Sequence, residues 1–132
     1  MSKNHFLLLG AGFAMLAVIF GAFGAHALEK MVPEQMLQRY HTGVDYQFYH
    51  AFALLVTGLL QQHLPHRALK WAGTAFILGI FLFSGSLYTY ALTGIKTFGM
   101  ITPLGGLAFI VGWISLITAI WQTPPRQKNQ KK

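Results

Sequence analysis

The residues best suited to chemistry stand together at positions 40–50, which read Tyr-His-Thr-Gly-Val-Asp-Tyr-Gln-Phe-Tyr-His. Groups four residues apart on a helix share one face, so His41 and Asp45 have the spacing of two ligands to one metal ion. His50 lies five residues beyond Asp45, about 140° around an ideal helix, and cannot reach the same ion on an unbroken helix. Nothing in the spacing selects haem between His26 and His50. We expect no metal and no other cofactor, although the sequence leaves open whether His26 and His50 bind an ion or only pack.

Other catalytic groups are scarce. The chain has no cysteine, and its only acids are Glu29, Glu34 and Asp45. Ser84-Gly85-Ser86 lacks the spacing and the strand-to-helix context of a nucleophile elbow. Because no base, nucleophile and orienting group fall together, we expect that the protein is not an enzyme.

The composition places these residues in a membrane protein. Of the 132 residues, 54% are hydrophobic and 10% charged, whereas about a quarter are charged in ordinary soluble domains. The formal net charge of +7 could suggest nucleic acid, but the ten basic residues are spread over both ends and the loops and form no single stripe. The sequence therefore predicts the lipid bilayer, not nucleic acid, as the main partner.

Four apolar stretches are each long enough to cross a hydrocarbon core of about 30 Å as a helix. They predict an all-α integral membrane four-helix bundle in one domain, residues 1–123, followed by a basic disordered tail at 124–132. Small residues recur every three or four positions along one face of the first span, where a neighbouring helix can approach closely: Gly10, Ala14, Ala17, Gly21 and Ala25. The four spans cover about residues 6–28, 44–62, 71–92 and 98–121.

The first span has one alternative interpretation. Ala25-His26-Ala27 matches a small-x-small cleavage site for signal peptidase, after an apolar segment with a single lysine. That segment is longer than a typical signal core and its n-region is weakly basic, so we expect the span to be retained.

A short amphipathic helix is expected between the first two spans. Pro33 suits a first helical turn, and Met36, Leu37 and Tyr40 follow at helical spacing, so the segment is predicted to lie at the membrane interface. We expect a bend into the second span at Gly43, with one continuous helix as the alternative.

Basic residues predict the orientation, because cytoplasmic segments carry the excess of lysine and arginine. Four spans place three of these residues on one side: Lys30, Arg39 and Lys96. The other side has seven, namely Lys3, Arg67, Lys70, Arg126, Lys128, Lys131 and Lys132. We therefore expect a bacterial inner-membrane, multi-pass protein with both termini in the cytoplasm.

Polar residues then gather in the outward halves of the spans. Ionisable groups inside a membrane are costly and turn toward other helices or a wet cavity, so we expect them to line an outward-facing polar pocket. His50 could pair there with Gln47, Tyr46, Ser84 or Ser86. The candidates are His26, Gln47, His50, Ser84, Ser86 and Tyr88, with His41, Asp45 and Thr102 as weaker ones.

Four stretches carry a family resemblance: Gly-Ala-Phe-Gly-Ala-His at 21–26, positions 42–50, Phe-Ser-Gly-Ser-Leu-Tyr at 83–88, and Thr-Pro-Leu-Gly-Gly at 102–106. Together they resemble the YgdD-like family of small bacterial inner-membrane proteins. The resemblance implies a four-span protein that keeps its first helix and has no assigned biochemical function. The matching stretches favour His26, Gln47 and His50, and they give less support to His41 and Asp45.

Two functions remain. We expect a structural or accessory membrane component, and the alternative is a small oligomeric transporter or channel subunit with His50 as its titrating group. The sequence leaves open any homo-oligomer, membrane-protein partner or transported solute.

Overall fold

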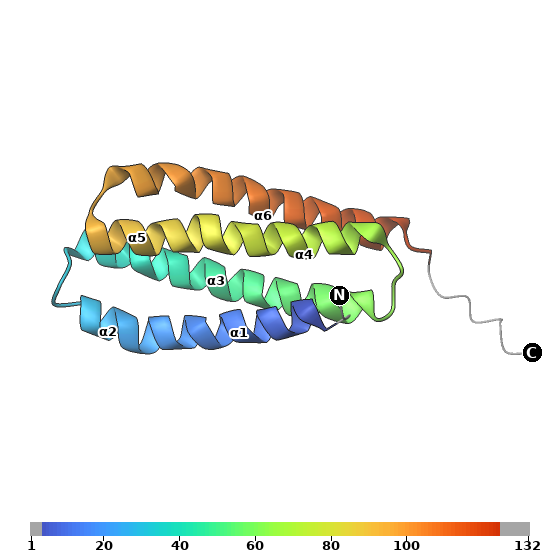
Figure 1. Cartoon of the computed structure of the whole chain (residues 1–132), viewed down its shortest axis with the longest axis horizontal. Helices are drawn as coiled ribbons and strands as arrows, with labels where there is room; N and C mark the ends of the chain where they lie inside the picture. The colour runs from blue at the N-terminus through green and yellow to red at the C-terminus, as the bar shows by residue number, and fades with distance from the viewer. Residues whose placement is uncertain (1–3, 125–132) are drawn as a thin grey trace, which may run out of the picture.

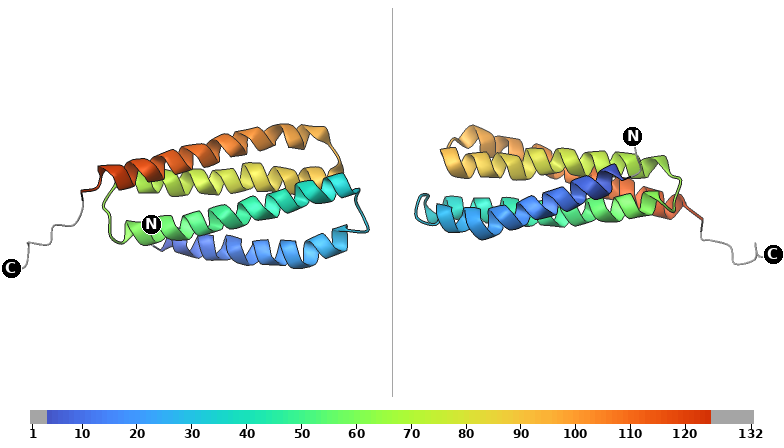
Figure 2. Two further views of the ribbon diagram at one scale, coloured as in Figure 1. Left: turned by 180° about the vertical axis from the view of Figure 1, so that it is seen from behind. Right: turned by 60° about the horizontal axis from the view of Figure 1, so that its bottom comes forward.

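The computed structural model describes residues 4–124, and in this part of the chain every regular element is a helix. The predicted tail lies outside the described residues, except Pro124. The first long helix consists of α1 (His5–Ile19), the π-helical segment η1 (Phe20–Gly24) and α2 (Ala25–Leu28), and the second is α3 (Glu34–Gln61). The third consists of α4 (Arg67–Gly79), the π-helical segment η2 (Ile80–Gly85) and α5 (Ser86–Thr93), and the fourth is α6 (Lys96–Gln122). The four long helices lie lengthwise side by side (Figure 1), and the other views agree (Figure 2).

Three of the four long helices are long and apolar enough to cross a membrane: His5–Leu28, Arg67–Thr93 and Lys96–Gln122. The remaining long helix, α3, is long enough to cross a membrane but is not apolar enough. Its first half carries charged and polar side chains, among them Glu34, Arg39 and Asp45. The predicted first, third and fourth spans therefore have matching apolar helices, while the predicted second span is part of a longer and more polar helix.

The predicted bend at Gly43 and the separate interfacial helix are both wrong. One unbroken helix runs from Glu34 to Gln61, so the long connection shrinks to residues 29–33. Gly43 is buried inside this helix, and a Cβ there would lie 2.8 Å from Cε1 of Tyr88. The glycine thus allows the ring of Tyr88 to approach α3 closely, and it does not break the helix.

The stripe of small residues on the first helix packs against α3, as expected. Ala17 is fully buried, and a Cβ on Gly10 would lie 2.9 Å from the carbonyl oxygen of Ala51. Gly21 faces Val44 in the same way, at 3.2 Å from Cγ1. Side chains of this size let the two helix backbones come close.

The π-helical segments lie at corresponding positions on two helices that run in the same direction. The N–H of Ala25 bonds to the carbonyl of Phe20, five residues earlier, whereas the N–H of Ser86 at the end of η2 bonds to the carbonyl of Phe83, three residues earlier. Both segments overlap stretches that carry the family resemblance, at 21–26 and 83–88. Such wide turns are rare and often occur at functional sites.

The distribution of apolar side chains is that of a protein surrounded by lipid. Large apolar side chains are exposed along the outer faces of the helices, including Leu8, Phe52, Leu107 and Ile114, while small, aromatic and a few polar residues fill the interior. Soluble proteins rarely expose contiguous apolar surface on this scale.

Candidate functional site

A chain of hydrogen bonds joins three of the helices through Gln47. This side chain is 2% exposed and stands on the inner face of α3. Its amide nitrogen donates to the carbonyl oxygen of Phe13 on α1 at 2.8 Å, and its amide oxygen accepts from the Tyr88 hydroxyl on α5 at 2.6 Å. Gln47 thus connects the first, second and third long helices.

Two serines continue the network toward α6. The hydroxyl of Ser84, fully buried in η2, donates to the carbonyl oxygen of Gly43 at 2.6 Å. Ser86 donates to the carbonyl oxygen of Phe83 at 2.9 Å and lies 2.6 Å from the hydroxyl of Thr102. Because a serine has only one O–H, Thr102 is the donor to Ser86.

His50 forms a second polar contact deeper between the helices. Its Nδ1 lies 2.8 Å from the carbonyl oxygen of Tyr46, which can only accept, so Nδ1 carries the proton. Its Nε2 accepts a hydrogen bond from the indole N–H of Trp113 at 3.1 Å. The imidazole also stacks on Phe109, with ring centroids 3.5 Å apart and planes 6° apart. This neutral tautomer therefore has a partner at both nitrogens.

Of the six main candidates, the structure brings Gln47, Ser84 and Tyr88 together around Gly43, and Ser86 bonds to the weaker candidate Thr102. His50 lies on the same helix but bonds to Tyr46 and Trp113, not to Gln47 or the serines. Of the four predicted partners of His50, only Tyr46 is one, and the bond is to its backbone carbonyl; the other three were Gln47, Ser84 and Ser86.

His26, His41 and Asp45 are not part of this network. All three are exposed, and none makes a hydrogen bond through its side chain within residues 4–124. Across the same residues, no three or more metal-ligating side chains converge. The chain therefore does not bring His26 to His50, and His41 and Asp45 remain at the surface of α3.

Tyr40 also belongs to the polar network between the helices, and the sequence did not predict this. Its hydroxyl donates to the carbonyl oxygen of Phe20 at 2.7 Å, and its ring lies 5.2 Å from that of Tyr88. Phe20 opens η1, and its carbonyl also accepts the wide-turn bond from Ala25. Trp113 was missed as well, although an indole N–H in the middle of a predicted span needs an acceptor and so gave a signal.

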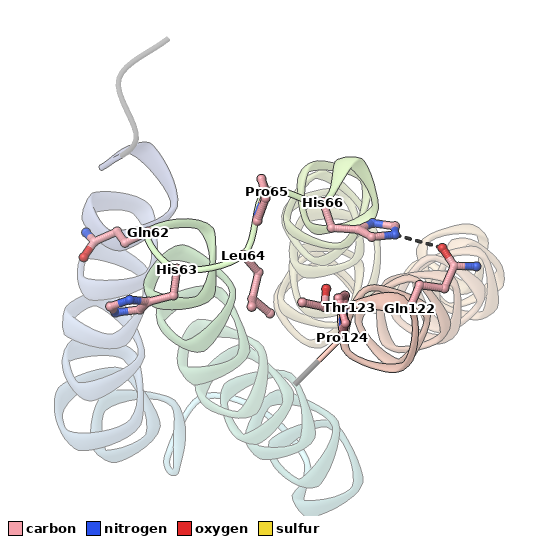
Figure 3. Close-up of a pocket in the computed structure, with 8 residues that line it drawn as sticks. All are labelled: Gln62, His63, Leu64, Pro65, His66, Gln122, Thr123 and Pro124. Carbon is pink, nitrogen blue, oxygen red and sulfur yellow. Dashed lines mark hydrogen bonds between the residues drawn. The ribbon is translucent and has the colours of Figure 1, made fainter. Parts of the chain in front are cut away.

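A separate cavity of about 710 Å³ lies at the other end of the molecule, between the α3–α4 turn and the end of α6 (Figure 3). His66 accepts from the N–H of Ala68 through Nδ1 and lies 2.8 Å from the amide oxygen of Gln122 through Nε2. The side chain of Leu64 lies between His66 and His63 in this view. The lining residues are Gln62, His63, Leu64, Pro65, His66, Gln122, Thr123 and Pro124.

Span-length apolar helices, an apolar outer surface and polar groups turned inward define a multi-pass helical membrane protein. The hydrogen-bonded groups connect helices, and they do not form a pair of nucleophile and base.

The chain belongs to the family described as "Protein of unknown function (DUF423)", whose model matches residues 20–106. This range contains all four stretches that carried the resemblance. The description agrees with the expected lack of an assigned function. The family that matches is DUF423, and the expected name YgdD is not found for it.

Curated relatives are named as membrane proteins. UPF0382 membrane protein YwdK of Bacillus subtilis (strain 168) is 50% identical over 115 residues, which are 86% of this chain and 94% of the relative. UPF0382 membrane protein SAB0533 of Staphylococcus aureus (strain bovine RF122 / ET3-1) is 45% identical over 117 residues, 89% of this chain and 95% of the relative. No solved structure matches the chain.

Proposed function

We propose that the protein is a non-enzymatic structural or accessory component of the bacterial inner membrane, built as a four-span bundle with both termini in the cytoplasm. In this proposal the inward polar residues stabilise the packing of the helices through hydrogen bonds and do not bind a solute. The observation that carries the proposal is the pairing of His50 at both ring nitrogens.

The engagement of His50 argues against a role in proton-coupled transport. A second proton would have to enter at Nε2, where the imidazole now accepts from the N–H of Trp113. Trp113 can only donate, so protonation would place two donors against each other. The stacked ring of Phe109 offers no alternative acceptor for an N–H in the ring plane.

The surface of α3 supports its assignment as the second span. From residue 49 onward its outward positions are apolar or aromatic, namely Tyr49, Phe52, Val56 and Leu59, each about half exposed. Its polar side chains in the same stretch, His50 and Thr57, are buried and bonded to carbonyl oxygens. A helix of 28 residues is about 42 Å long, enough for the hydrocarbon core and part of one headgroup layer.

The orientation rests on the seven-to-three excess of lysine and arginine described above, and the first turn of α4 contributes Arg67 and Lys70 to the cytoplasmic side. A reporter fused after Lys132 tests it: activity confined to the outer side would contradict the cytoplasmic C-terminus.

The His50→Ala variant tests the structural role. We expect a lower membrane abundance and a loss of about 1–3 kcal/mol in stability, because a buried ring and two hydrogen bonds are removed. The measurements are the amount of protein in the membrane fraction, thermal unfolding in detergent, and proton flux in proteoliposomes. His63→Ala is the control, since His63 is an exposed histidine in the turn. Unchanged abundance and stability with an altered flux would instead support transport.

A further inference from the structure

Arg39 is a partly buried arginine without an acidic partner. Its Nε is buried and has no hydrogen-bond partner within the described part of the chain. The guanidinium carbon lies 4.9 Å from the centroid of the Tyr90 ring, and this is its only specific contact among residues 4–124. The three acids of the chain form no ion pair with it there. Guanidinium presents five N–H donors in a planar fork, so this group is poised to bind an anion from outside the protein.

The contact of Tyr90 with the start of α6 places a second basic residue, Lys96, at the same end of the molecule as Arg39, and the acids Glu29 and Glu34 also lie at this end. The Tyr90 ring packs on Gly99, where a Cβ would lie 2.5 Å from Cε2 of the tyrosine. Gly99 is in the first turn of α6, which begins with Lys96 and contains no acidic residue. Figure 1 shows the beginning of α3, the end of α5 and the beginning of α6 at the same end of the molecule. Arg39 and Lys96 therefore stand at one end of neighbouring helices.

The outer surface of α6 gives the depth of this end in the bilayer. Its exposed large apolar residues run from Met100 to Trp121, a rise of about 32 Å, which is close to the thickness of a hydrocarbon core. Gly99 lies immediately before this band, and Lys96 about 6 Å beyond Met100. The Tyr90 ring on Gly99, and the guanidinium on that ring, therefore lie beside the edge of this apolar band, where the hydrocarbon core gives way to the headgroup layer.

We propose that Arg39 binds the phosphate of a phospholipid headgroup, with Tyr90 holding the guanidinium in place beside it. The planar fork matches two phosphate oxygens, and the aromatic face favours arginine over the more strongly hydrated lysine. This inference goes beyond the structural role proposed above and does not depend on the number of spans. A free phosphate ion shares the chemistry, but the depth of the group points to the lipid.

Native mass spectrometry of the detergent-purified full chain tests the site, with dihexanoyl phosphatidylglycerol, glycerol 3-phosphate and inorganic phosphate as probes. We expect the lipid to bind at least tenfold more weakly to Arg39→Gln and at least threefold more weakly to Arg39→Lys, which keeps the charge but not the fork. Lys30→Gln removes one positive charge at the same end and should change binding less than twofold. Thermal unfolding of each variant shows whether it is folded.

Three results would overturn the proposal. Equal lipid binding by the wild type and both Arg39 variants would remove Arg39 from the site. An equal loss in Lys30→Gln would replace a specific site by a general effect of charge. Displacement of the lipid by glycerol 3-phosphate or inorganic phosphate at matched concentration would assign the site to a soluble anion.

Discussion

At the scale of single residues, the polar groups between the helices act as connections. Gln47 contacts α1 with one end of its amide and α5 with the other, and His50 links α3 to α6 through Trp113. Interhelical hydrogen bonds of this kind contribute about 0.6 kcal/mol each in membrane proteins, and up to about 1.7 kcal/mol. Small contributions of this size still fix which faces of the helices meet.

The Tyr88→Phe variant tests one such connection. It removes the hydroxyl that donates to Gln47 and keeps the ring that packs against Tyr40 and Phe20. We expect a loss of about 0.5–2 kcal/mol, because the amide oxygen of Gln47 stays buried without its donor. Unfolding in detergent with increasing dodecyl sulfate measures the change.

Tyr49→Phe is the matched control for that variant. Tyr49 is 57% exposed, and its hydroxyl makes no hydrogen bond among the described residues. The stability of the Tyr49→Phe variant should stay within about 0.5 kcal/mol of the wild type. Equal losses in the two variants would mean that the bond to Gln47 has no special role.

At the scale of elements, helix positions were predictable and their local geometry was not. Long apolar runs determined three of the helices. The turn around Pro65 and the tight connection at Gly94, which has φ of 71°, fall between the predicted spans 44–62, 71–92 and 98–121. The continuity of α3 was misjudged because glycine lowers helix propensity, whereas Gly43 is held in the helix by close packing.

The partners of the polar residues were harder to predict than the residues themselves. Gln47, Ser84 and Tyr88 were recognised as inward-facing because polar groups inside a membrane avoid lipid. Their acceptors are largely backbone carbonyls, such as those of Phe13 and Gly43, and side-chain type does not reveal these. His26 was misplaced because η1 precedes it, and a wider turn shifts the direction of every later side chain.

Gly43→Ala tests the close packing of α3. The added methyl group would meet Cε1 and Cδ1 of Tyr88, at 2.8 and 3.2 Å, and displace the ring that bonds to Gln47. We expect a net loss of about 1–3 kcal/mol despite the better helix propensity of alanine. Thermal unfolding in detergent measures the difference.

Gly12→Ala on α1 isolates the effect of propensity alone. Gly12 is also helical, but a Cβ there meets nothing within 4 Å. This variant should be as stable as the wild type or more stable by up to about 1 kcal/mol. If Gly43→Ala is as stable as Gly12→Ala, the approach of Tyr88 to α3 is not tight.

At the scale of the whole molecule, the central claim is that α3 crosses the membrane in spite of its polar residues. The lipid-exposed faces of the other three long helices are apolar over span length, and α3 continues this surface from Tyr49 to Leu59. Its polar side chains in that stretch have partners inside the protein, which removes most of the cost of placing them in a membrane.

Cysteine labelling in intact cells tests this claim most directly, because the natural chain has no cysteine. Lys30→Cys stands before α3 and Arg67→Cys after it, and both positions are exposed. If α3 crosses the membrane, a membrane-impermeant maleimide added outside will label Lys30→Cys, and Lys96→Cys likewise, but will reach Arg67→Cys only after the cells are opened. Labelling of Lys30→Cys and Arg67→Cys from the same side would contradict the account.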